Sequence, residues 1–340
     1  QIFDMELFRR SGHYEHYKEN MFACSIDERE FGVKPMNCPG HCVLFGQTRR
    51  SYRDLPVRIA DFGRLHRYER AGVTHGLTRV RTFCQDDAHI FCTPDQVEQE
   101  IAGVTAMILE CYRTFGFDSV EIEVSTRPES VLGEISTWDR AEAALQAALR
   151  EQGLEFRINA GDGAFYGPKI DFKVRDALRR SWQLGTVQLD FQLPQRFDLE
   201  FVAADDGRGR PVMIHRAMLG SLERFFGVYL EHVAGKLPTW LAPVQVAILA
   251  IADRHHAWAQ EVAAALRAQG VRAHADLRSE KLGAKIREAT LQRVPYMLVV
   301  GDKEAEARTV AARSRDGQQG SPEPLADFVA RLAREAAIPA

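Results

Sequence analysis

The stretch of sequence that decides the fold runs from Arg58 to Cys92 and reads RIADFGRLHRYERAGVTHGLTRVRTFCQDDAHIFC. Arginines, histidines and carboxylates alternate here with apolar residues, and on a β-sheet such alternation projects the charged side chains from one face. The simplest interpretation is a solvated sheet face with scattered ion pairs. That interpretation is weakened by a group of charged residues close together in the sequence. They are Arg67, Glu69, Arg79 and Arg81, beside the uncommon run QDDAH at residues 85–89. Clustered guanidinium groups suit a polyphosphate, because each offers a planar fork of donors to phosphate oxygens.

The residues around this stretch, up to about residue 240, read as further strands and two helices. The segment TPDQVEQEIAGVTAMILECYRTFGF, at 93–117, predicts a helix with Thr93 as its N-cap and Pro94 in its first turn. WDRAEAALQAALREQG, at 138–153, predicts a second helix that ends at Gly153. The segments VEIEVST, KIDFKV, TVQLDFQL and PVMIH are strand-like in their β-branched content and alternation. Because strands follow strands, we expect a mainly antiparallel sheet.

The order of secondary-structure patterns changes after LPTWLAP, at residues 237–243. The strand-like segments VQVAILAI, VRAHADL and YMLVVG are separated by helical segments at about 256–269 and 282–293, which predicts parallel pairing. A strand in TVAARSR and an amphipathic helix in LADFVARLAREAA follow. We therefore expect an α/β chain of two domains. Residues 1–241 form an α+β domain with an antiparallel sheet, and residues 242–340 form an α/β domain with a mixed sheet.

Composition narrows the classes of function. The 340 residues are 45% hydrophobic and 27% charged, as in an ordinary globular protein. There is no long apolar run, and the N-terminal QIFDMELFRRSGHYEHY lacks the apolar core of a signal peptide, so we expect a cytoplasmic protein and no membrane partner. A net charge of −3 excludes bulk attraction to phosphates, so RNA would have to bind to local patches. Six cysteines without a CxxC pair argue against a disulfide framework.

Several motifs resemble those of class II aminoacyl-tRNA synthetases. Arg67-Tyr68-Glu69 is similar to the RxE core of the second signature motif of that class, and the segment from Gly220 to Phe225 is similar to the third motif. Five blocks resemble threonyl-tRNA synthetases in particular: KPMNCPGH (34–41), QDDAHIF (85–91), GAFYGPKI (163–170), TVQLDF (186–191) and VMIHRAMLGSLERF (212–225). The resemblance implies the antiparallel class II synthetase sheet and threonine–tRNA ligase activity. It also implies that the first class motif and the editing region of the family are missing from this sequence.

The resemblance implies that ATP binds in the first domain together with Mg²⁺. Arg67 would hold the α-phosphate, Arg224 the far phosphates, Glu69 the adenine amino group, and Phe83 would stack on the ring. Fixed guanidinium groups stabilise the charge that develops when a carboxylate attacks the α-phosphorus. Further candidates for nucleotide contacts, each also compatible with an ordinary sheet-face residue, are Arg79, Lys169, Gln183 and Gln188.

The metal ligands of the family fall on Cys38, His89 and His215, which implies one Zn²⁺ per subunit. Their separation gives no spacing signature, and taken alone each residue is more often structural. The residues alone also leave other ligand sets open, namely Cys38 with His41 and Cys42, and Cys84 or Cys92 with His89. Three protein ligands leave zinc an open position. The resemblance assigns that position to the amino and hydroxyl groups of L-threonine.

The resemblance also implies the remaining contacts with threonine, which are Asp87 for the hydroxyl group, Gln85 and Tyr166 for the ammonium group, and Met36 and Ala217 as pocket walls. A site built to engage a hydroxyl group rejects valine strongly and serine weakly, because serine lacks only a methyl group. His13 matches a family position beside the terminal adenosine of tRNA, where it would assist the transfer step. A partly exposed loop histidine is the alternative.

The second domain contains DLRSEKLGAKIRE, at 276–288, and PYMLVVGDKE, at 295–304, which resemble the anticodon-binding domain shared by several class II synthetases. By this resemblance Arg287, Glu304 and Arg313 would contact the anticodon of tRNA(Thr). Single-stranded loops are read by stacking and by hydrogen bonds to base edges, so a strongly basic surface is not required. Ser279 stands where many relatives have asparagine. Enzymes of this type are usually homodimers, and we expect the same here.

Two other functions compete with the active ligase. Arg70, Thr82 and Cys84 depart from the residues frequent in relatives, so an inhibitor-resistant or catalytically silent paralogue that binds tRNA is one alternative. A zinc-dependent hydrolase with Asp87 as its base is the other. The signature arginines and all three metal-ligand positions are retained, which favours the ligase over a silent paralogue. A hydrolase would not explain the ATP motifs or the second domain.

Overall fold

A computed structural model describes residues 1–339, which separate into two units, Gln1–His232 and a second that begins at Val233. The domain division at residues 241 and 242 stays a prediction. No helix among residues 1–339 combines the length and the apolar character needed to cross a lipid bilayer.

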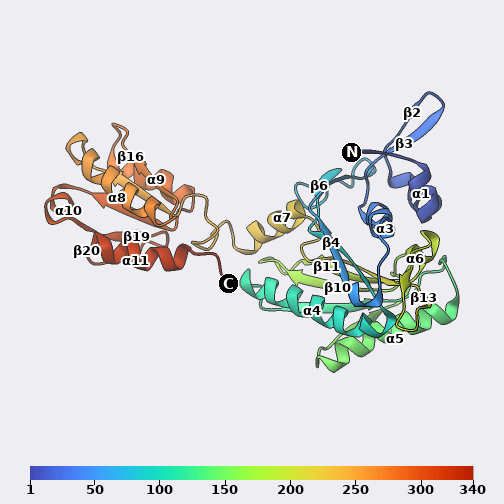
Figure 1. The fold of residues 1–340 in the computed structure, drawn as a ribbon. Coiled ribbons are helices and arrows are strands. Elements are labelled where there is room, and N and C mark those ends of the chain that lie inside the picture. The colour runs from blue at the N-terminus through green and yellow to red at the C-terminus, as the bar shows by residue number, and fades with distance from the viewer. Residues whose placement is uncertain (340) are drawn as a thin grey trace. The chain divides into compact units, whose positions relative to one another are not determined.

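The first unit is built on a seven-stranded sheet among the described residues, in the order β4-β7-β14-β11-β10-β8-β9 (Figure 1). The strands are β4 (Val57–Asp61), β7 (Asp87–Cys92), β8 (Val120–Ser125), β9 (Arg157–Asn159), β10 (Lys169–Arg175), β11 (Ser181–Asp190) and β14 (Val212–Ala217). All neighbours pair antiparallel except β8 and β9, which are parallel. The predicted mainly antiparallel sheet is confirmed.

Two long helices, α4 (Val97–Thr114) and α5 (Ile135–Glu151), cover one face of this sheet (Figure 1). Each has an apolar stripe at three-and-four spacing, which buries Ile101, Val104 and Ile108 of α4 and Leu145 of α5. Thr93 caps a 3₁₀ turn, η3 (Pro94–Gln96), that leads into α4. Both predicted helices are confirmed, and the second begins three residues earlier than predicted.

The opposite face of the sheet packs against the N-terminal segment. Helix α3 (Cys38–Gly46) stacks Phe45 on Phe91 of β7 with ring centroids 4.5 Å apart, and Met213 of β14 joins the same core. The surrounding elements are β1 (Ile2–Asp4), α1 (Glu6–Ser11), α2 (His13–Tyr17), η1 (Lys18–Asn20), β2 (Ala23–Ile26), β3 (Arg29–Val33), η2 (Tyr52–Asp54), α6 (Gln192–Arg196), β12 (Phe201–Val202) and β13 (Arg208–Gly209). Asp87 and His89 therefore lie on the face that α3 covers, because alternate residues of a strand share a face.

The stretch from Arg58 to Cys92 is divided between two sheets. Its ends form β4 and β7 of the central sheet, whereas β5 (Arg64–His66) and β6 (Thr82–Cys84) form a separate two-stranded hairpin with a loop at 67–81. We predicted that the charged side chains of this stretch project from one face of one sheet. That prediction is wrong for residues 62–86. Helix α7 (Leu222–His232) packs beside β6 and β11.

The second unit contains a four-stranded sheet within the described residues, in the order β16-β15-β17-β19. β15 (Val246–Ala250) pairs parallel with β16 (Ala273–Asp276) and β17 (Tyr296–Val300), and β19 (Ala312–Ser314) is antiparallel to β17. The remaining elements are η4 (Asp253–His255), α8 (His256–Ala268), α9 (Leu282–Leu291), α10 (Asp302–Ala307), β18 (Thr309–Val310), β20 (Glu323–Pro324) and α11 (Leu325–Ala336). The mixed sheet is confirmed. The single strand predicted in TVAARSR is instead divided into β18 and β19, which pair with different partners.

Candidate functional site

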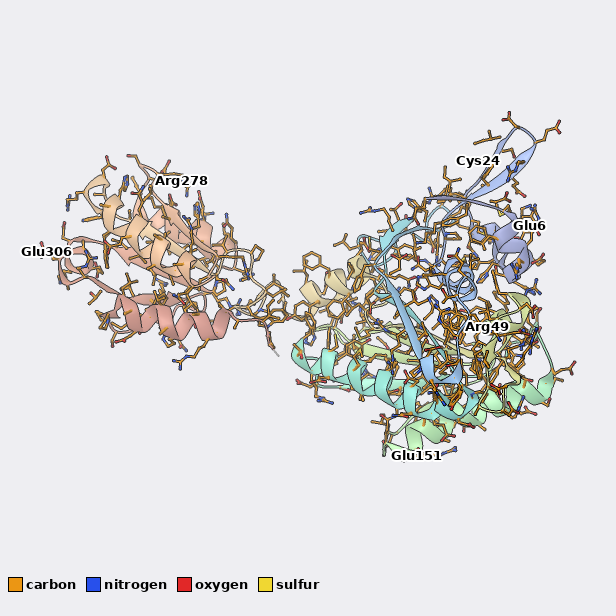
Figure 2. All side chains as sticks on the ribbon, viewed as in Figure 1. Glu6, Cys24, Arg49, Glu151, Arg278 and Glu306 are labelled. Atoms are coloured by element: carbon orange, nitrogen blue, oxygen red, sulfur yellow. The ribbon has the colours of Figure 1, made fainter. Side chains whose placement is uncertain are left out.

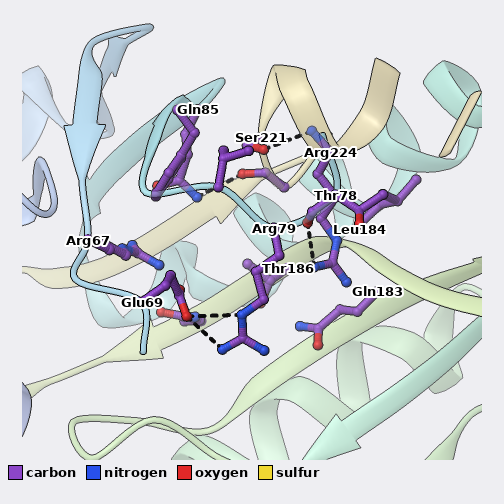
Figure 3. Close-up of a pocket in the computed structure, with 14 residues that line it drawn as sticks. Arg67, Glu69, Thr78, Arg79, Gln85, Gln183, Leu184, Thr186, Ser221 and Arg224 are labelled. Carbon is purple, nitrogen blue, oxygen red and sulfur yellow. Dashed lines mark hydrogen bonds and ion pairs between the residues drawn. The ribbon is translucent and has the colours of Figure 1, made fainter. Parts of the chain in front are cut away.

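A cavity of about 380 Å³ lies in the first unit, where the β5–β6 hairpin and its loop meet β11 and the start of α7. Its lining residues are Arg67, Glu69, Thr78, Arg79, Val80, Phe83, Gln85, Gln183, Leu184, Thr186, Gln188, Gly220, Ser221 and Arg224. Figure 3 shows the guanidinium groups of Arg67, Arg79 and Arg224 around this space. Three such groups facing one cavity are suited to a polyphosphate.

Neighbouring groups hold the first two arginines in place. Nε of Arg67 donates to the carbonyl of Pro35 at 3.2 Å, and its guanidinium lies 5.1 Å from the ring centroid of Phe83. Arg79 forms an ion pair with Glu69, with Nε 3.0 Å from Oε2 (Figure 3). A phosphate or base entering the cavity would meet these side chains already ordered, which lowers the entropy cost of binding.

Arg224 is half-buried at the cavity. Burial, together with the charge of Arg79, lowers the pKa of its guanidinium from the ordinary value. Within residues 1–339 its buried Nε has no hydrogen-bond partner, and Nη1 reaches the carbonyl of Thr78 at 3.4 Å. Its guanidinium also lies 5.7 Å from the ring centroid of Trp182. The half-buried guanidinium of Arg224 therefore has donors available for an anionic ligand.

Two of the candidates on β10 and β11, Lys169 and Gln183, share one carboxylate. Asp171 is buried and accepts from Gln183, from Thr186 at 3.2 Å and from Ser125 at 2.9 Å. Lys169 is not among the residues that line the cavity in the described part of the chain. Its Nζ lies 2.9 Å from Oδ2 of Asp171. Asp171 therefore orients the side chains of Gln183 and Thr186 at the cavity wall.

Sequence reasoning missed part of the lining, namely Thr78, Val80, Leu184, Thr186, Gly220 and Ser221. Thr186 could have been found, because it alternates with the predicted Gln188 along β11 and so shares its face. Leu184 stands at a β-bulge, where alternation gives no signal. Ser221 could have been found as a helix cap, since its Oγ accepts from the backbone N–H of Arg224 at 3.0 Å. Thr78 and Val80 belong to the irregular loop and carry no local signal.

A second cluster joins Cys38, at the start of α3, with His89 on β7 and His215 on β14. The two histidines are direct partners in the β7–β14 ladder, and one donor atom from each residue of the trio lies within 4.8 Å of the others. All three side chains are buried. One thiol and two imidazoles form a donor set that zinc prefers, and three ligands leave a fourth position open.

Hydrogen bonds orient both imidazoles of the cluster. Nε2 of His215 lies 2.9 Å from Oδ2 of Asp190, and Nδ1 of His89 lies 2.7 Å from Nδ1 of His41. These contacts leave Nδ1 of His215 and Nε2 of His89 for the centre of the cluster. His41 is thus a partner of a candidate ligand, and Cys42 contacts Met213 with its sulfur at 3.7 Å. Among the described residues, His41, Cys42, Cys84 and Cys92 belong to no group of metal-ligand geometry, so those alternative ligand sets are not supported.

Protonation states also bear on the fit to a metal. Burial lowers the pKa of His89 well below the ordinary value, so the ring is neutral, as a metal ligand must be. Burial raises the pKa of the Cys38 thiol, with Asp87 adding to the shift. A divalent cation would reverse that second effect, because it stabilises the thiolate directly. The donor set therefore fits zinc.

The predicted threonine contacts lie beside the arginine-lined cavity and the thiol–imidazole cluster of Cys38, His89 and His215. Tyr166 stacks on His215 with ring centroids 5.0 Å apart, and its hydroxyl donates to Oε1 of Gln188. Gln188 is also the ladder partner of His215, so it connects the arginine-lined cavity with the thiol–imidazole cluster. Burial raises the pKa of Asp87 to about 6, and a hydrogen bond from Asn37 opposes that shift. Met36 and Ala217 are buried, and Gln85 donates to the carbonyl of Gly220 at 2.8 Å.

His13 lies in α2 and is only 3% exposed, so the alternative of a partly exposed loop histidine is wrong. Its Nδ1 lies 2.8 Å from Oγ of Ser11 and its Nε2 lies 3.8 Å from Sγ of Cys38. Burial lowers the pKa of His13 to about 3, so the imidazole is neutral. His13 is therefore next to the thiol–imidazole cluster.

The three anticodon candidates lie on three elements of the second unit. Arg287 is exposed on α9, Glu304 on α10 accepts from the backbone N–H of Gly301 at 3.0 Å, and Arg313 is half-buried on β19. Arg278, labelled in Figure 2, follows β16 and pairs with Asp276 at the end of that strand, with Nη2 2.6 Å from Oδ2. Glu304 and Arg278 thus already have partners within the fold.

Comparison with known proteins identifies both units. Residues 22–233 match the model of the class II tRNA synthetase core domain for glycine, histidine, proline, serine and threonine enzymes. Residues 245–335 match the anticodon-binding domain model. A structure described as the RNA-binding domain of threonyl-tRNA synthetase from Cryptosporidium parvum superposes with a TM-score of 0.95 and 46% identity, over 100% of this chain and 85% of that one.

Curated relatives point to the same family. A threonine–tRNA ligase of Bdellovibrio bacteriovorus is 57% identical over 94% of this chain and 49% of its own length. Another, from Acetivibrio thermocellus, is 56% identical over 97% of this chain and 52% of its own length. The chain thus spans about half the length of these relatives. On this sequence and structural similarity, the chain belongs to the threonyl-tRNA synthetase family of class II aminoacyl-tRNA synthetases.

Proposed function

We propose that this chain carries the activity of a threonine–tRNA ligase, which activates L-threonine with ATP and Mg²⁺ and transfers it to tRNA(Thr). One observation carries the proposal: Gln188 lines the arginine-rich cavity and is paired in the sheet with His215 of the thiol–imidazole cluster. A nucleotide in the cavity and an amino acid at the cluster would therefore be neighbours. Such proximity is what the joining of two substrates requires.

In the activation step, a carboxylate oxygen of threonine attacks the α-phosphorus of ATP. The bond from that phosphorus to the bridging oxygen breaks, and pyrophosphate leaves. Arg67, which is held by the carbonyl of Pro35, stabilises the charge on the α-phosphate. Arg224, whose Nε has no partner among the described residues, stabilises that on the departing phosphates. Glu69 and Phe83 hold the adenine, and Arg79, Lys169, Gln183 and Gln188 complete the nucleotide contacts. The step needs no covalent intermediate with the protein.

Cys38, His89 and His215 would hold one zinc ion. When bound, zinc supplies a Lewis-acidic open position that suits the amino and hydroxyl groups of threonine. Asp87 accepts the hydrogen of that hydroxyl group, and Gln85 and Tyr166 face the ammonium group. Met36 and Ala217 limit the space for larger side chains. Valine, which has no hydroxyl group, leaves Oδ1 of Asp87 without a partner and is rejected strongly, whereas serine keeps the hydroxyl and is rejected weakly.

The transfer step involves the second unit as well. A hydroxyl group of the terminal ribose attacks the carbonyl carbon of threonyl-adenylate, and AMP leaves. His13, neutral and close to Cys38, is the proposed helper of this step. Arg287, Glu304 and Arg313 contact the anticodon, which is read by stacking and base-edge hydrogen bonds. We further propose a homodimer that acts in the cytoplasm.

Amino-acid-dependent exchange of pyrophosphate into ATP tests the proposal. The protein should catalyse exchange strongly with threonine, more weakly with serine and not with valine, and treatment with a chelator should abolish it. Re-addition of Zn²⁺ should restore the exchange. No exchange by fully metallated protein would refute the ligase and support a catalytically silent paralogue, which the retained arginines and donor residues do not favour.

A further inference from the structure

Asn37 joins the start of α3 to strand β7 inside the first unit. It directly precedes Cys38, and its backbone carbonyl accepts from the N–H of His41 at 3.1 Å. Its side chain reaches across to β7, where Nδ2 donates to Oδ2 of Asp87 at 2.9 Å. Asn37 is 1% exposed and Asp87 is 9% exposed, so water hardly competes for this bond.

The contact determines which way the amide faces. Oδ1 of Asn37 is buried and has no hydrogen-bond partner among residues 1–339, so the bond to Asp87 is what fixes the side chain. Reversing the amide would place its oxygen against a carboxylate oxygen, which is repulsive. A buried acceptor without a partner is costly. The hydrogen bond from Nδ2 to Asp87 is the interaction of this amide that offsets the cost.

The two oxygens of Asp87 are thereby given different roles. Asn37 occupies Oδ2, whereas Oδ1 lies 3.8 Å from Nε2 of His89 and has no hydrogen bond within the described residues. Because Nδ1 of His89 contacts His41, Nε2 is the nitrogen on the side of the donor cluster. Oδ1 is therefore the oxygen that remains free to accept a hydrogen beside that cluster.

We propose that Asn37 is a positioning residue for threonine selection: it holds Asp87 so that Oδ1 faces the hydroxyl group of the bound amino acid. The inference rests on the proposed function and adds a residue that acts through Asp87 without touching substrate. Without Asn37 the carboxylate would rotate about its side-chain bonds, and the hydroxyl group would lose a fixed acceptor. Contacts with ATP lie in the arginine-lined cavity and would be unaffected.

The test is Asn37→Asp, which keeps the size of the side chain and replaces the amide donor with a second carboxylate. Exchange kinetics with threonine and valine, KM for ATP, direct threonine binding by calorimetry and zinc content are measured on the same metallated protein. We expect kcat/KM and affinity for threonine to fall about 10- to 100-fold, because an unpaired buried partner is costly. Neither protein should catalyse exchange with valine, and KM for ATP and zinc content should stay within about twofold.

The matched control is Asn159→Asp, which makes the same exchange at an amide that donates to Asp162 at 3.2 Å near the surface. It should leave threonine kinetics unchanged. The pair of changes Asn37→Asp and Asp87→Asn restores a donor–acceptor pair with its ends exchanged. It should recover the thermal stability that the single change Asn37→Asp costs.

Each outcome decides between the two proposals. If the unchanged protein neither activates nor binds threonine, the proposed function fails and the inference fails with it. If the unchanged protein is active and Asn37→Asp keeps its kcat/KM and affinity for threonine, the inference alone is overturned. If Asn37→Asp does not fold, Asn37→Ala, which adds no charge, must show the same threonine-selective loss. Loss of zinc or of ATP affinity in both variants would make Asn37 part of the framework and overturn the inference.

Discussion

Nδ1 of His41 lies 2.7 Å from Nδ1 of His89, and both rings are buried. Two nitrogens at this distance share one hydrogen, so one ring donates and the other accepts. A metal on Nε2 of His89 leaves the hydrogen of that neutral ring on Nδ1, so His89 donates and His41 accepts. His41 thereby selects the tautomer of His89 in which Nε2 is free to bind the metal.

This relationship predicts that His41→Ala weakens zinc binding while the three donor residues remain. Loss of an orienting partner of this kind typically lowers metal affinity about 10- to 100-fold. Competition with a chromogenic chelator measures the affinity directly. His274→Ala, at an exposed position on β16 of the second unit, is the control. Equal zinc affinities of His41→Ala and the unchanged protein would show that His41 does not orient His89.

A second prediction concerns Trp182, whose ring lies 5.7 Å from the guanidinium of Arg224. A cation near an aromatic face gains about 0.5 to 2 kcal/mol, depending on how dry the site is. Trp182→Ala should therefore raise KM for ATP about 2- to 30-fold and leave KM for threonine unchanged. Trp182→Phe keeps a ring and should lie between the two. Exchange kinetics with each substrate varied in turn measure this split, and a rise in both KM values would contradict it.

The sequence predicted regular elements well where one local pattern decides them. The apolar stripe of α4 and the alternation in β10 and β11 are local, and burial on the sheet reinforces both. TVAARSR also has the composition of a strand. Val310 and Ala312 nevertheless lie in two strands with different partners, β18 with β20 and β19 with β17. Strand pairing is a tertiary property, and composition does not encode it.

The candidate site was predictable only in part, for a similar reason. The residues themselves gave no signal for the trio of Cys38, His89 and His215, and the resemblance supplied it. Their proximity arises from the register that pairs His89 with His215 and from the packing of α3 on β7. The partners that orient them, Asp190 and His41, were not assigned that role because hydrogen bonds between distant segments leave no local pattern.

A third prediction separates the two chemical steps. Arg287 is exposed on α9, and Arg287→Ala should lower kcat/KM for charging of tRNA(Thr) by about tenfold or more. Pyrophosphate exchange takes place without tRNA and should not change. Arg334→Ala, at another exposed arginine on α11, is the matched control and should charge normally. A parallel loss in both arginine variants would indicate a general charge effect instead of a specific contact.

The last prediction is an acid-dependent stability in the second unit. Hydrogen bonds from Arg278, with Nη2 2.6 Å from Oδ2, hold the pKa of Asp276 below the ordinary 3.8. Because the folded pKa lies below the unfolded one, the charged pair stabilises the fold above pH 3.8, and this contribution is lost as the pH falls through the folded pKa. Asp276→Asn should therefore lower the urea midpoint at pH 7 by about 0.2 to 0.5 M.

The difference between Asp276→Asn and the unchanged protein should shrink steadily below pH 3.8, since protonation removes from the unchanged protein the same charge that the substitution removes. Urea denaturation at a series of pH values, followed by circular dichroism, measures it. Glu306→Gln, at an exposed carboxylate of α10, is the control and should give no such trend. A difference that stays constant with pH would mean that the substitution acts through lost packing, and the charged pair of Asp276 with Arg278 would not be the stabilising element.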